Sequence, residues 1–343
     1  MSVIVTDGLG KRYGRTVVAL EDLTIDVRPG EIFGFLGPNG AGKSTTIRLL
    51  LGFLHPTAGQ ATVLGMDTER ESVQIRSRVG YLPGGIALYD SLSGEDLLDY
   101  LADLYGRTAP SRGDLLDRFE FSERDLRRPV RDYSRGMRQK IGIVQALQHD
   151  PELAILDEPT EGLDPLMQRA FYGILEDLRA RGRTIFISSH VLSEVERVCD
   201  RVAIIRQGRL ATLQDVGALL ARRKRNVEMR LAGPAPVLDG VPGVSGVSAN
   251  DGLLTCQLEG DVRPFLRAIA SAPITDLTIE PAHLEEAFLE FYADELGLTA
   301  GRDGASRAGQ VAASSELPAS ADTQSATPVG AATASDADQE ADR

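Results

Sequence analysis

The sequence predicts an α/β protein in which helices cover a mostly parallel β-sheet, and two observations carry this prediction. Short apolar runs of strand length recur along the first two thirds of the chain and alternate with segments of helical periodicity. A glycine-rich loop joins one of these strands to one of these helices, a connection typical of parallel sheets. With 343 residues the chain is long enough to bury a full core and to form more than one domain.

The expected elements of the first domain follow in order. Residues 2–9 and 16–27 are rich in Val, Ile, Leu and Thr and predict strands of an N-terminal antiparallel β part. A strand at 31–36 leads into the glycine-rich loop and a helix at 43–54. Residues 90–148 are charged and mainly helical in periodicity, which predicts a helical insert. Further strands separated by helices are expected at residues 153–157, 184–188 and 201–206.

The composition changes after the basic run at residues 222–225, so we expect the first domain to cover residues 1–225. Residues 226–298 predict a small α+β accessory domain with Pro/Gly turns. Its elements are expected as strands at 227–231, 244–249, 253–259 and 274–279 and helices at 262–271 and 282–296. Residues 299–343 are acidic and rich in Ala and Ser without an aromatic residue, and such a segment is predicted to be disordered.

Composition also limits the partners. The formal net charge of −13 favours solubility and disfavours a nucleic-acid partner. No run of eighteen apolar residues occurs, and the N-terminus lacks the pattern of a secretory signal, so a cytoplasmic chain is expected. Cys199 and Cys256 stand alone and are predicted to be buried thiols.

The glycine-rich loop matches the phosphate-binding pattern G-x-x-x-x-G-K-[ST]. Its residues are Gly37, Pro38, Asn39, Gly40, Ala41, Gly42, Lys43, Ser44 and Thr45. Glycines let backbone N–H groups wrap a phosphate chain at a helix N-terminus. Lys43 is expected to reach the β- and γ-phosphates and Ser44 to ligate magnesium. Because the loop follows a predicted strand and opens a predicted helix, it favours a P-loop NTPase core over a structural glycine turn.

Two carboxylates follow the apolar run at 153–156. Asp157 is placed to hold magnesium, directly or through water, and Glu158 to polarise the attacking water. Paired acids at a strand end are often only a solvated turn, but about one hundred residues after a phosphate loop they predict phosphoryl transfer.

Two further candidates admit structural readings. Ser134 and Gly136 open the predicted helix through residue 148, where they fit either an N-cap or a second anion site aimed at a γ-phosphate. His190 follows the strand at 184–188; it is either a structural histidine or, at the end of a core strand, a contact to the γ-phosphate.

With these motifs in this order, residues 2–231 resemble the nucleotide-binding subunits of ABC transporters. GPNGAGKST is similar to the Walker A loop of that family, and LAILDEPT to its Walker B strand with Glu158 as the catalytic carboxylate. YSRGMRQ is similar to the LSGGQ signature and retains Ser134 and Gly136, although arginine and methionine replace its first glycine and its glutamine.

The resemblance assigns three more residues. Asp164 in Gly-Leu-Asp corresponds to the D-loop aspartate that joins two active sites, and His190 corresponds to the switch histidine. Tyr13 corresponds to the aromatic residue that stacks on adenine, although a strand-edge aromatic is the alternative. One position departs from the family: Gly84 stands where a glutamine or glutamate usually ligates magnesium.

The family's sites form between two nucleotide domains paired head to tail, so the resemblance implies a homodimer that binds ATP and Mg²⁺. It also implies a separate transmembrane permease subunit and a peripheral position on the cytoplasmic face of the cell membrane. FLGPNGAGKST, YSRGM and the C-terminal LEEAFL resemble bacterial export systems for drug-, lipid- or peptide-like substrates. The alternative is a non-transport ABC ATPase acting on a macromolecular complex, such as a ribosome or a repair complex. A P-loop GTPase or kinase would leave the signature loop unexplained.

Overall fold

The structure is a computed structural model that describes residues 1–106, 108–221 and 225–280. The predicted helix at 282–296 and the predicted tail at 299–343 lie outside the described residues. Among the described residues no helix is long and apolar enough to cross a membrane.

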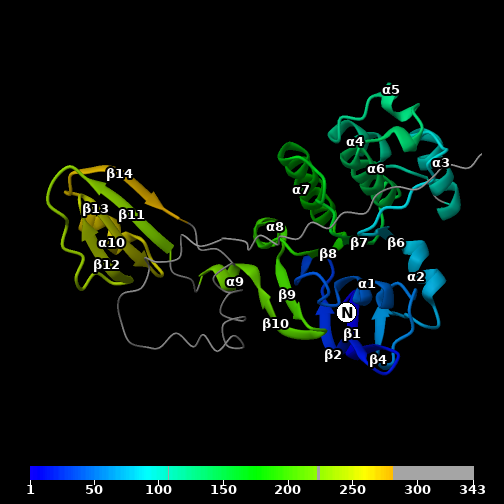
Figure 1. Cartoon of the computed structure of the whole chain (residues 1–343), viewed down its shortest axis with the longest axis horizontal. Coiled ribbons are helices and arrows are strands. Elements are labelled where there is room, and N and C mark those ends of the chain that lie inside the picture. Colours follow the sequence, from blue (N-terminus) through cyan, green and yellow to red (C-terminus); the bar gives the residue numbers. More distant parts are fainter. Residues whose placement is uncertain (107, 222–224, 281–343) are drawn as a thin grey trace, which may run out of the picture. The chain divides into compact units, whose positions relative to one another are not determined.

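An antiparallel sheet opens the chain, as predicted, in the order β2-β1-β4-β5 (Figure 1). Its long strands β1 (Ile4–Tyr13) and β2 (Val17–Val27) pair directly, and β4 (Ala58–Val63) pairs with the other edge of β1. The short β5 (Met66–Asp67) completes the sheet. Neither β4 nor β5 was expected, because β4 begins with Ala58-Gly59-Gln60 and β5 has only two residues.

A second sheet of six strands has the order β10-β9-β3-β8-β7-β6. Its members are β3 (Ile32–Leu36), β6 (Val79–Leu82), β7 (Leu153–Asp157), β8 (Thr184–Ser189), β9 (Arg201–Arg206) and β10 (Arg209–Asp215). All of these strands except β10 run parallel to one another, which confirms the predicted sheet. β10 pairs with β9 in the antiparallel direction. The central strands are buried throughout because both faces of the sheet are covered.

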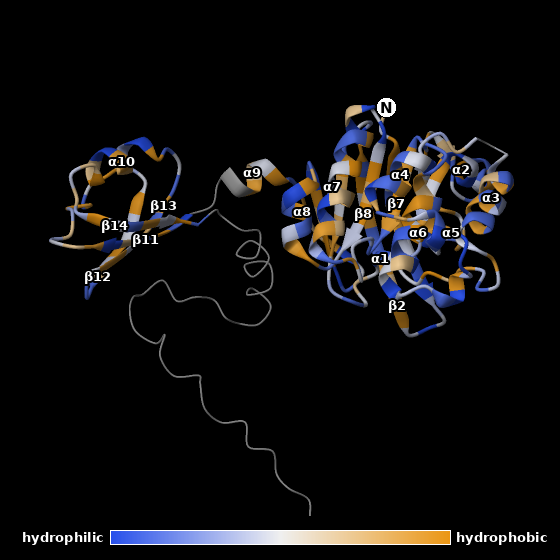
Figure 2. Cartoon of the chain, turned by 90° about the horizontal axis from the view of Figure 1, so that it is seen from above, coloured by the Kyte–Doolittle hydropathy of each residue, from blue (hydrophilic) through white to orange (hydrophobic). Residues whose placement is uncertain are grey.

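Alternate residues of the parallel strands enter two different cores. In β7, Ala154 and Leu156 pack into a core with the helical insert, whereas Leu153 and Ile155 pack into a core with the antiparallel sheet. Phe33 of β3 stacks on Phe186 of β8 in this second core, with ring centroids 5.7 Å apart. Figure 2 shows the hydrophobic residues gathered along these strands and hydrophilic residues on the outer helix surfaces.

Helices pack on the sheet and, within the helical insert, on one another. They are α1 (Lys43–Leu50), α2 (Ser72–Arg78), α3 (Gly94–Tyr105), α4 (Arg112–Arg118), α5 (Glu123–Leu126), α6 (Arg135–Leu147), α7 (Pro165–Ala180), α8 (Leu192–Val198) and α9 (Val216–Ala221). A 3-10 turn, Val130–Asp132, precedes α6. Helices α3 to α6 form the predicted helical insert (Figure 1).

The described C-terminal residues form an α+β unit with a core of its own. Its sheet has the order β12-β13-β11-β14, from β11 (Arg225–Leu231), β12 (Val244–Asn250), β13 (Leu253–Leu258) and β14 (Ile274–Ile279). Phe265 and Ile269 of α10 (Arg263–Ile269) pack on Val227 and Met229 of β11. These elements agree with the expected ones, and the division at residues 225 and 226 stays a prediction.

Candidate active site

The loop between β3 and α1 requires glycine at two positions. A Cβ atom on Gly37 would lie 2.4 Å from the carbonyl oxygen of Ile205, and one on Gly42 would lie 2.6 Å from that of Ala19. Gly42 also has a φ of 109°, which side chains rarely adopt. As the N-cap of α1 it offers no side chain to the first N–H groups of the helix. Those groups remain available to an anion.

Lys43, the first residue of α1, extends back over this loop. Its Nζ donates a hydrogen bond to the carbonyl oxygen of Gly37 at 2.7 Å and lies 3.1 Å from Oε1 of Glu158. The lysine side chain is only 6% exposed, so its charge needs these partners. The lysine thus joins the phosphate loop to the end of β7.

Asp157, the last residue of β7, accepts hydrogen bonds from two hydroxyl groups. The hydroxyl of Ser44 donates to its Oδ2 at 2.8 Å, and the hydroxyl of Ser188 donates to its Oδ1. Hydroxyl and carboxylate oxygens are the ligands that Mg²⁺ prefers, and this ion is usually held by few protein groups together with phosphate oxygens. The residues present therefore fit a magnesium ion.

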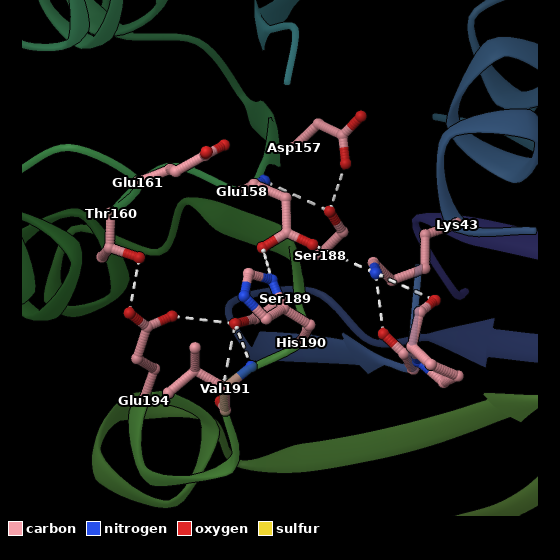
Figure 3. Close-up of polar contacts among 12 residues, drawn as sticks. Lys43, Asp157, Glu158, Thr160, Glu161, Ser188, Ser189, His190, Val191 and Glu194 are labelled. Carbon is pink, nitrogen blue, oxygen red and sulfur yellow. Dashed lines mark hydrogen bonds and ion pairs between the residues drawn. The ribbon is translucent and has the colours of Figure 1, made fainter. Parts of the chain in front are cut away.

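Glu158 lies between the phosphate loop and the end of β8 (Figure 3). Its Oε2 is 2.7 Å from Nδ1 of His190, while its Oε1 faces Lys43. The backbone of Glu158 is left-handed, with a φ of 51°, and its N–H donates to the carbonyl oxygen of Ser188 at 3.2 Å. Unusual backbone conformations of this kind gather at functional sites.

Lys43, Asp157 and Glu158 border a cleft of about 280 Å³, whereas His190 is not among the residues that line it. Its lining residues are Ala19, Pro38, Asn39, Gly40, Gly42, Lys43, Ser44, Thr45, Gly84, Asp157 and Glu158. Gly84 lies against the carboxylate of Asp157, because a Cβ atom at Gly84 would be 3.1 Å from Oδ2 of Asp157. The position that departs from the family therefore faces the expected magnesium site.

Ser134 of the expected signature and Asp164 of the expected D-loop lie outside this cleft and cap helices. The hydroxyl of Ser134 accepts a hydrogen bond from the N–H of Met137 at 3.2 Å and caps α6. Asp164 caps α7, and the N–H of Met167, followed by that of Leu166, lowers the pKa of its carboxyl. Neither of these residues, nor Gly136, lines the cleft of the same chain.

The signature loop and the segment after β7 nevertheless lie side by side. A Cβ atom on Gly136 would be 3.1 Å from the carbonyl oxygen of Gly162, and the guanidinium of Arg135 pairs with Glu161. The arginine that replaces the first glycine of the signature is thus anchored to the neighbouring loop.

Tyr13 lies at the end of β1, with 40% of its surface exposed and Nζ of Lys11 5.5 Å from its ring centroid. Tyr13 is not among the residues that line the cleft. Its stacking on adenine stays a prediction.

Sequence reasoning missed the residues that support the carboxylates from behind. Ser188 holds both Asp157 and the backbone of Glu158, and Nε2 of Gln139 in α6 donates to the carbonyl oxygen of Pro159 at 2.7 Å. A signal existed, since two consecutive serines end the apolar run of β8 and Gln139 is a polar residue on the buried face of α6.

A parallel sheet with a phosphate loop after β3 and a carboxylate pair after β7 defines a P-loop nucleoside triphosphatase. The family pattern described as ABC transporter matches residues 20–161. An uncharacterised ABC transporter ATP-binding protein of Nostoc sp. is 42% identical over 230 residues, which are 64% of this chain and 68% of the relative.

A fluoroquinolones export ATP-binding protein of Mycobacterium tuberculosis is 39% identical over 236 residues, covering 67% of this chain and 77% of the relative. Among solved structures, one described as the ATP-binding subunit of an ABC transporter aligns with a TM-score of 0.60 and 33% identity. That alignment covers 64% of this chain and 92% of the solved one. This chain belongs to the ABC transporter ATP-binding proteins, a family of ATP hydrolases.

Proposed function

We propose that this chain hydrolyses ATP to power export of a drug-, lipid- or peptide-like substrate through a separate membrane permease. The observation that supports this most is Glu158, whose carboxylate joins Lys43 of the phosphate loop to His190 after β8. Lys43 and Glu158 line one cleft at the carboxyl ends of the parallel strands, where α/β folds bind ligands, and His190 contacts Glu158 from outside the cleft lining.

Each side chain has a role in this proposal. Lys43 and the N–H groups of the loop hold the β- and γ-phosphates, and Lys43 exchanges its contact with Glu158 for phosphate oxygens. Glu158 then accepts a hydrogen bond from a water and orients it in line with the γ-phosphorus, while His190 contacts the γ-phosphate. Water adds to phosphorus as the bond to the bridging oxygen breaks, giving ADP and inorganic phosphate.

Ser44 and Asp157 would hold Mg²⁺, which neutralises phosphate charge when it is bound. Gly84 contributes no side-chain ligand here. We propose that water completes the coordination, since this ion readily keeps several waters.

The placement of the signature loop supports a dimer. Ser134, Gly136 and Asp164 lie outside the cleft of their own chain, so an opposing subunit is needed if they are to contact nucleotide. Two copies paired head to tail would each present the N-terminus of α6 to the other's γ-phosphate, where the helix dipole favours an anion.

Export is supported by the M. tuberculosis relative, whose name attributes fluoroquinolone export to it. We therefore place the chain at the cytoplasmic face of the membrane, bound to a permease. The test is to purify a tagged chain from detergent-solubilised membranes of its own host and to identify its partners by mass spectrometry. A multi-span membrane protein is expected; a ribosomal or repair complex without such a protein would favour the non-transport alternative.

A further inference from the structure

A third carboxylate stands behind the Glu158–His190 pair. Glu194 lies in the first turn of α8 and is partly buried. Its Oε1 accepts a hydrogen bond from the hydroxyl of Thr160 at 2.5 Å, and its Oε2 accepts one from the hydroxyl of Ser189 at 2.8 Å. Figure 3 shows this bridge beside the contact of Glu158 with His190.

The two bridged hydroxyls belong to the two segments that carry the reacting groups. Thr160 lies two residues after Glu158, and Ser189 directly precedes His190. Both hydroxyl-bearing residues are buried, with exposures of 7% and 0%. The hydrogen bonds to Glu194 therefore fix the segment that follows β7 relative to the end of β8.

The hydroxyl of Ser189 is committed on both sides. It accepts a hydrogen bond from the N–H of Val191 at 2.9 Å, which closes the turn around His190, and it donates to Glu194. Glu194 is the nearer of its two acceptors, at 2.8 Å against 3.5 Å for the carbonyl oxygen of Val191, so this hydroxyl links the turn that carries the histidine to the carboxylate. Hydrogen bonds from a hydroxyl to an oxygen acceptor are short, in agreement with the 2.5 Å distance from Thr160 to Glu194.

We infer that Glu194 is a positioning residue for ATP hydrolysis, which clamps the segments of Glu158 and His190 in one arrangement without touching the nucleotide. This inference rests on the catalytic roles proposed for those two residues. A carboxylate suits the task because two hydroxyl donors need two acceptor oxygens. Glutamine offers one acceptor and an NH₂ group, and aspartate is one methylene too short to keep both bonds.

The test compares Glu194→Ala, Glu194→Gln and Glu194→Asp in the full chain by ATP turnover, ATP affinity and melting temperature. We expect Glu194→Ala to lower kcat about tenfold or more, since small misplacements of reacting groups are costly. The dissociation constant for ATP should stay within about twofold, because the contacts of the phosphate loop are untouched. Glu194→Gln should lose less than Glu194→Ala.

Each arm of the clamp can also be removed alone. Thr160→Val and Ser189→Ala should each lower kcat with little change in ATP affinity, and adding Thr160→Val to Glu194→Ala should cost little more. Glu176→Gln, an exposed carboxylate on α7, is the matched control and should keep the original kcat.

Several outcomes would overturn the inference: an unchanged kcat in Glu194→Ala, a loss that only follows a fall in melting temperature, or an equal loss of ATP affinity. If Glu194→Ala does not fold, the two single-arm variants carry the test. Glu158→Gln in the same assay separates this inference from the proposed function. Full turnover in Glu158→Gln would remove the site assignment, whereas an inert Glu158→Gln beside an active Glu194→Ala would remove only the clamp.

Discussion

At the scale of single residues, Glu158 is the central residue of the proposed site because it contacts both Lys43 and His190. It is the first residue after β7, has a positive φ, and places its two carboxylate oxygens on a lysine and a histidine from distant parts of the chain. The surrounding structure holds this backbone, because its N–H donates to both the carbonyl and the hydroxyl oxygen of Ser188. The group that we propose to orient water is therefore held in place by the ends of β7 and β8.

Lys43→Ala is expected to weaken nucleotide binding itself. It removes a buried charge that faces the phosphates in the proposed site, and hydrogen bonds to charged groups contribute about 1.5–3 kcal/mol, a factor of about ten to a hundred in affinity. Equilibrium titration with a fluorescent ATP analogue measures the change. Unchanged affinity would refute the assignment of the cleft.

Gly84→Gln tests the position where this chain departs from its family. A side chain there would meet the carboxylate of Asp157, so we expect the magnesium dependence of hydrolysis to shift. We expect basal turnover to stay within a few-fold if water serves in place of a side-chain ligand. ATPase activity measured against magnesium concentration reports both quantities.

Gly85→Gln is the matched control for that variant, because a Cβ atom at Gly85 meets no atom within 4 Å. Rescue of an otherwise inert protein by Gly84→Gln, measured with its permease, would contradict the account and mark the chain as a degenerate subunit.

At the scale of elements, the sequence predicted the strands whose apolar runs are complete. β3, β7 and β8 are buried along their length, and each contains a run of three to five consecutive apolar residues. β6 and β10 were missed, since β6 is four residues long with a glycine inside it, and β10 is a partly exposed edge strand.

Among the residues of the candidate site, some could likewise be predicted from the sequence and others could not. Lys43, Ser44, Asp157 and Glu158 could be predicted as site residues because they belong to short contiguous motifs. Glu194 and Ser188 were not, because their roles depend on which strand ends become neighbours, and β7 pairs with β8 across a connection that contains α7. A local pattern carries no information about that pairing.

Gly80→Ala is expected to destabilise the fold where β6 packs on α6. A Cβ atom at Gly80 would lie 2.0 Å from the carbonyl oxygen of Ala146, and backbone cannot move aside cheaply. Overpacking of this kind costs about 1–3 kcal/mol, so a fall in melting temperature of several degrees is expected. Gly113→Ala on α4 is the control, since open space surrounds it. An unaltered melting temperature in Gly80→Ala would show that this packing is wrong.

At the scale of the whole molecule, residues 299–343 differ in composition from the rest of the chain. Truncation after Leu298 removes residues 299–343, which lie outside the described structure and contain no aromatic residue. Because this composition offers little to pack, melting temperature and ATPase rate should stay nearly unchanged. A loss of several degrees, measured by calorimetry on both forms, would mean that the segment folds onto the rest of the chain.

Pairing of two chains around ATP is the other expectation at this scale. The cleft of one chain holds Lys43 and Glu158, whereas Ser134 and Gly136 lie outside it, so the site that we propose would need a second copy. A variant that binds ATP without hydrolysing it should therefore accumulate as a dimer, because no ATP hydrolysis occurs to make the dimer dissociate.

Glu158→Gln tests the central claim most directly, in one sample analysed for both ATP turnover and molecular mass by light scattering. The substitution keeps the size of the side chain and leaves the phosphate loop intact while it removes the charge that orients water. We expect ATP binding to persist, turnover to nearly stop and an ATP-dependent dimer to form. Turnover near that of the unchanged protein, with a monomer at saturating ATP, would contradict both the role of Glu158 and the shared site.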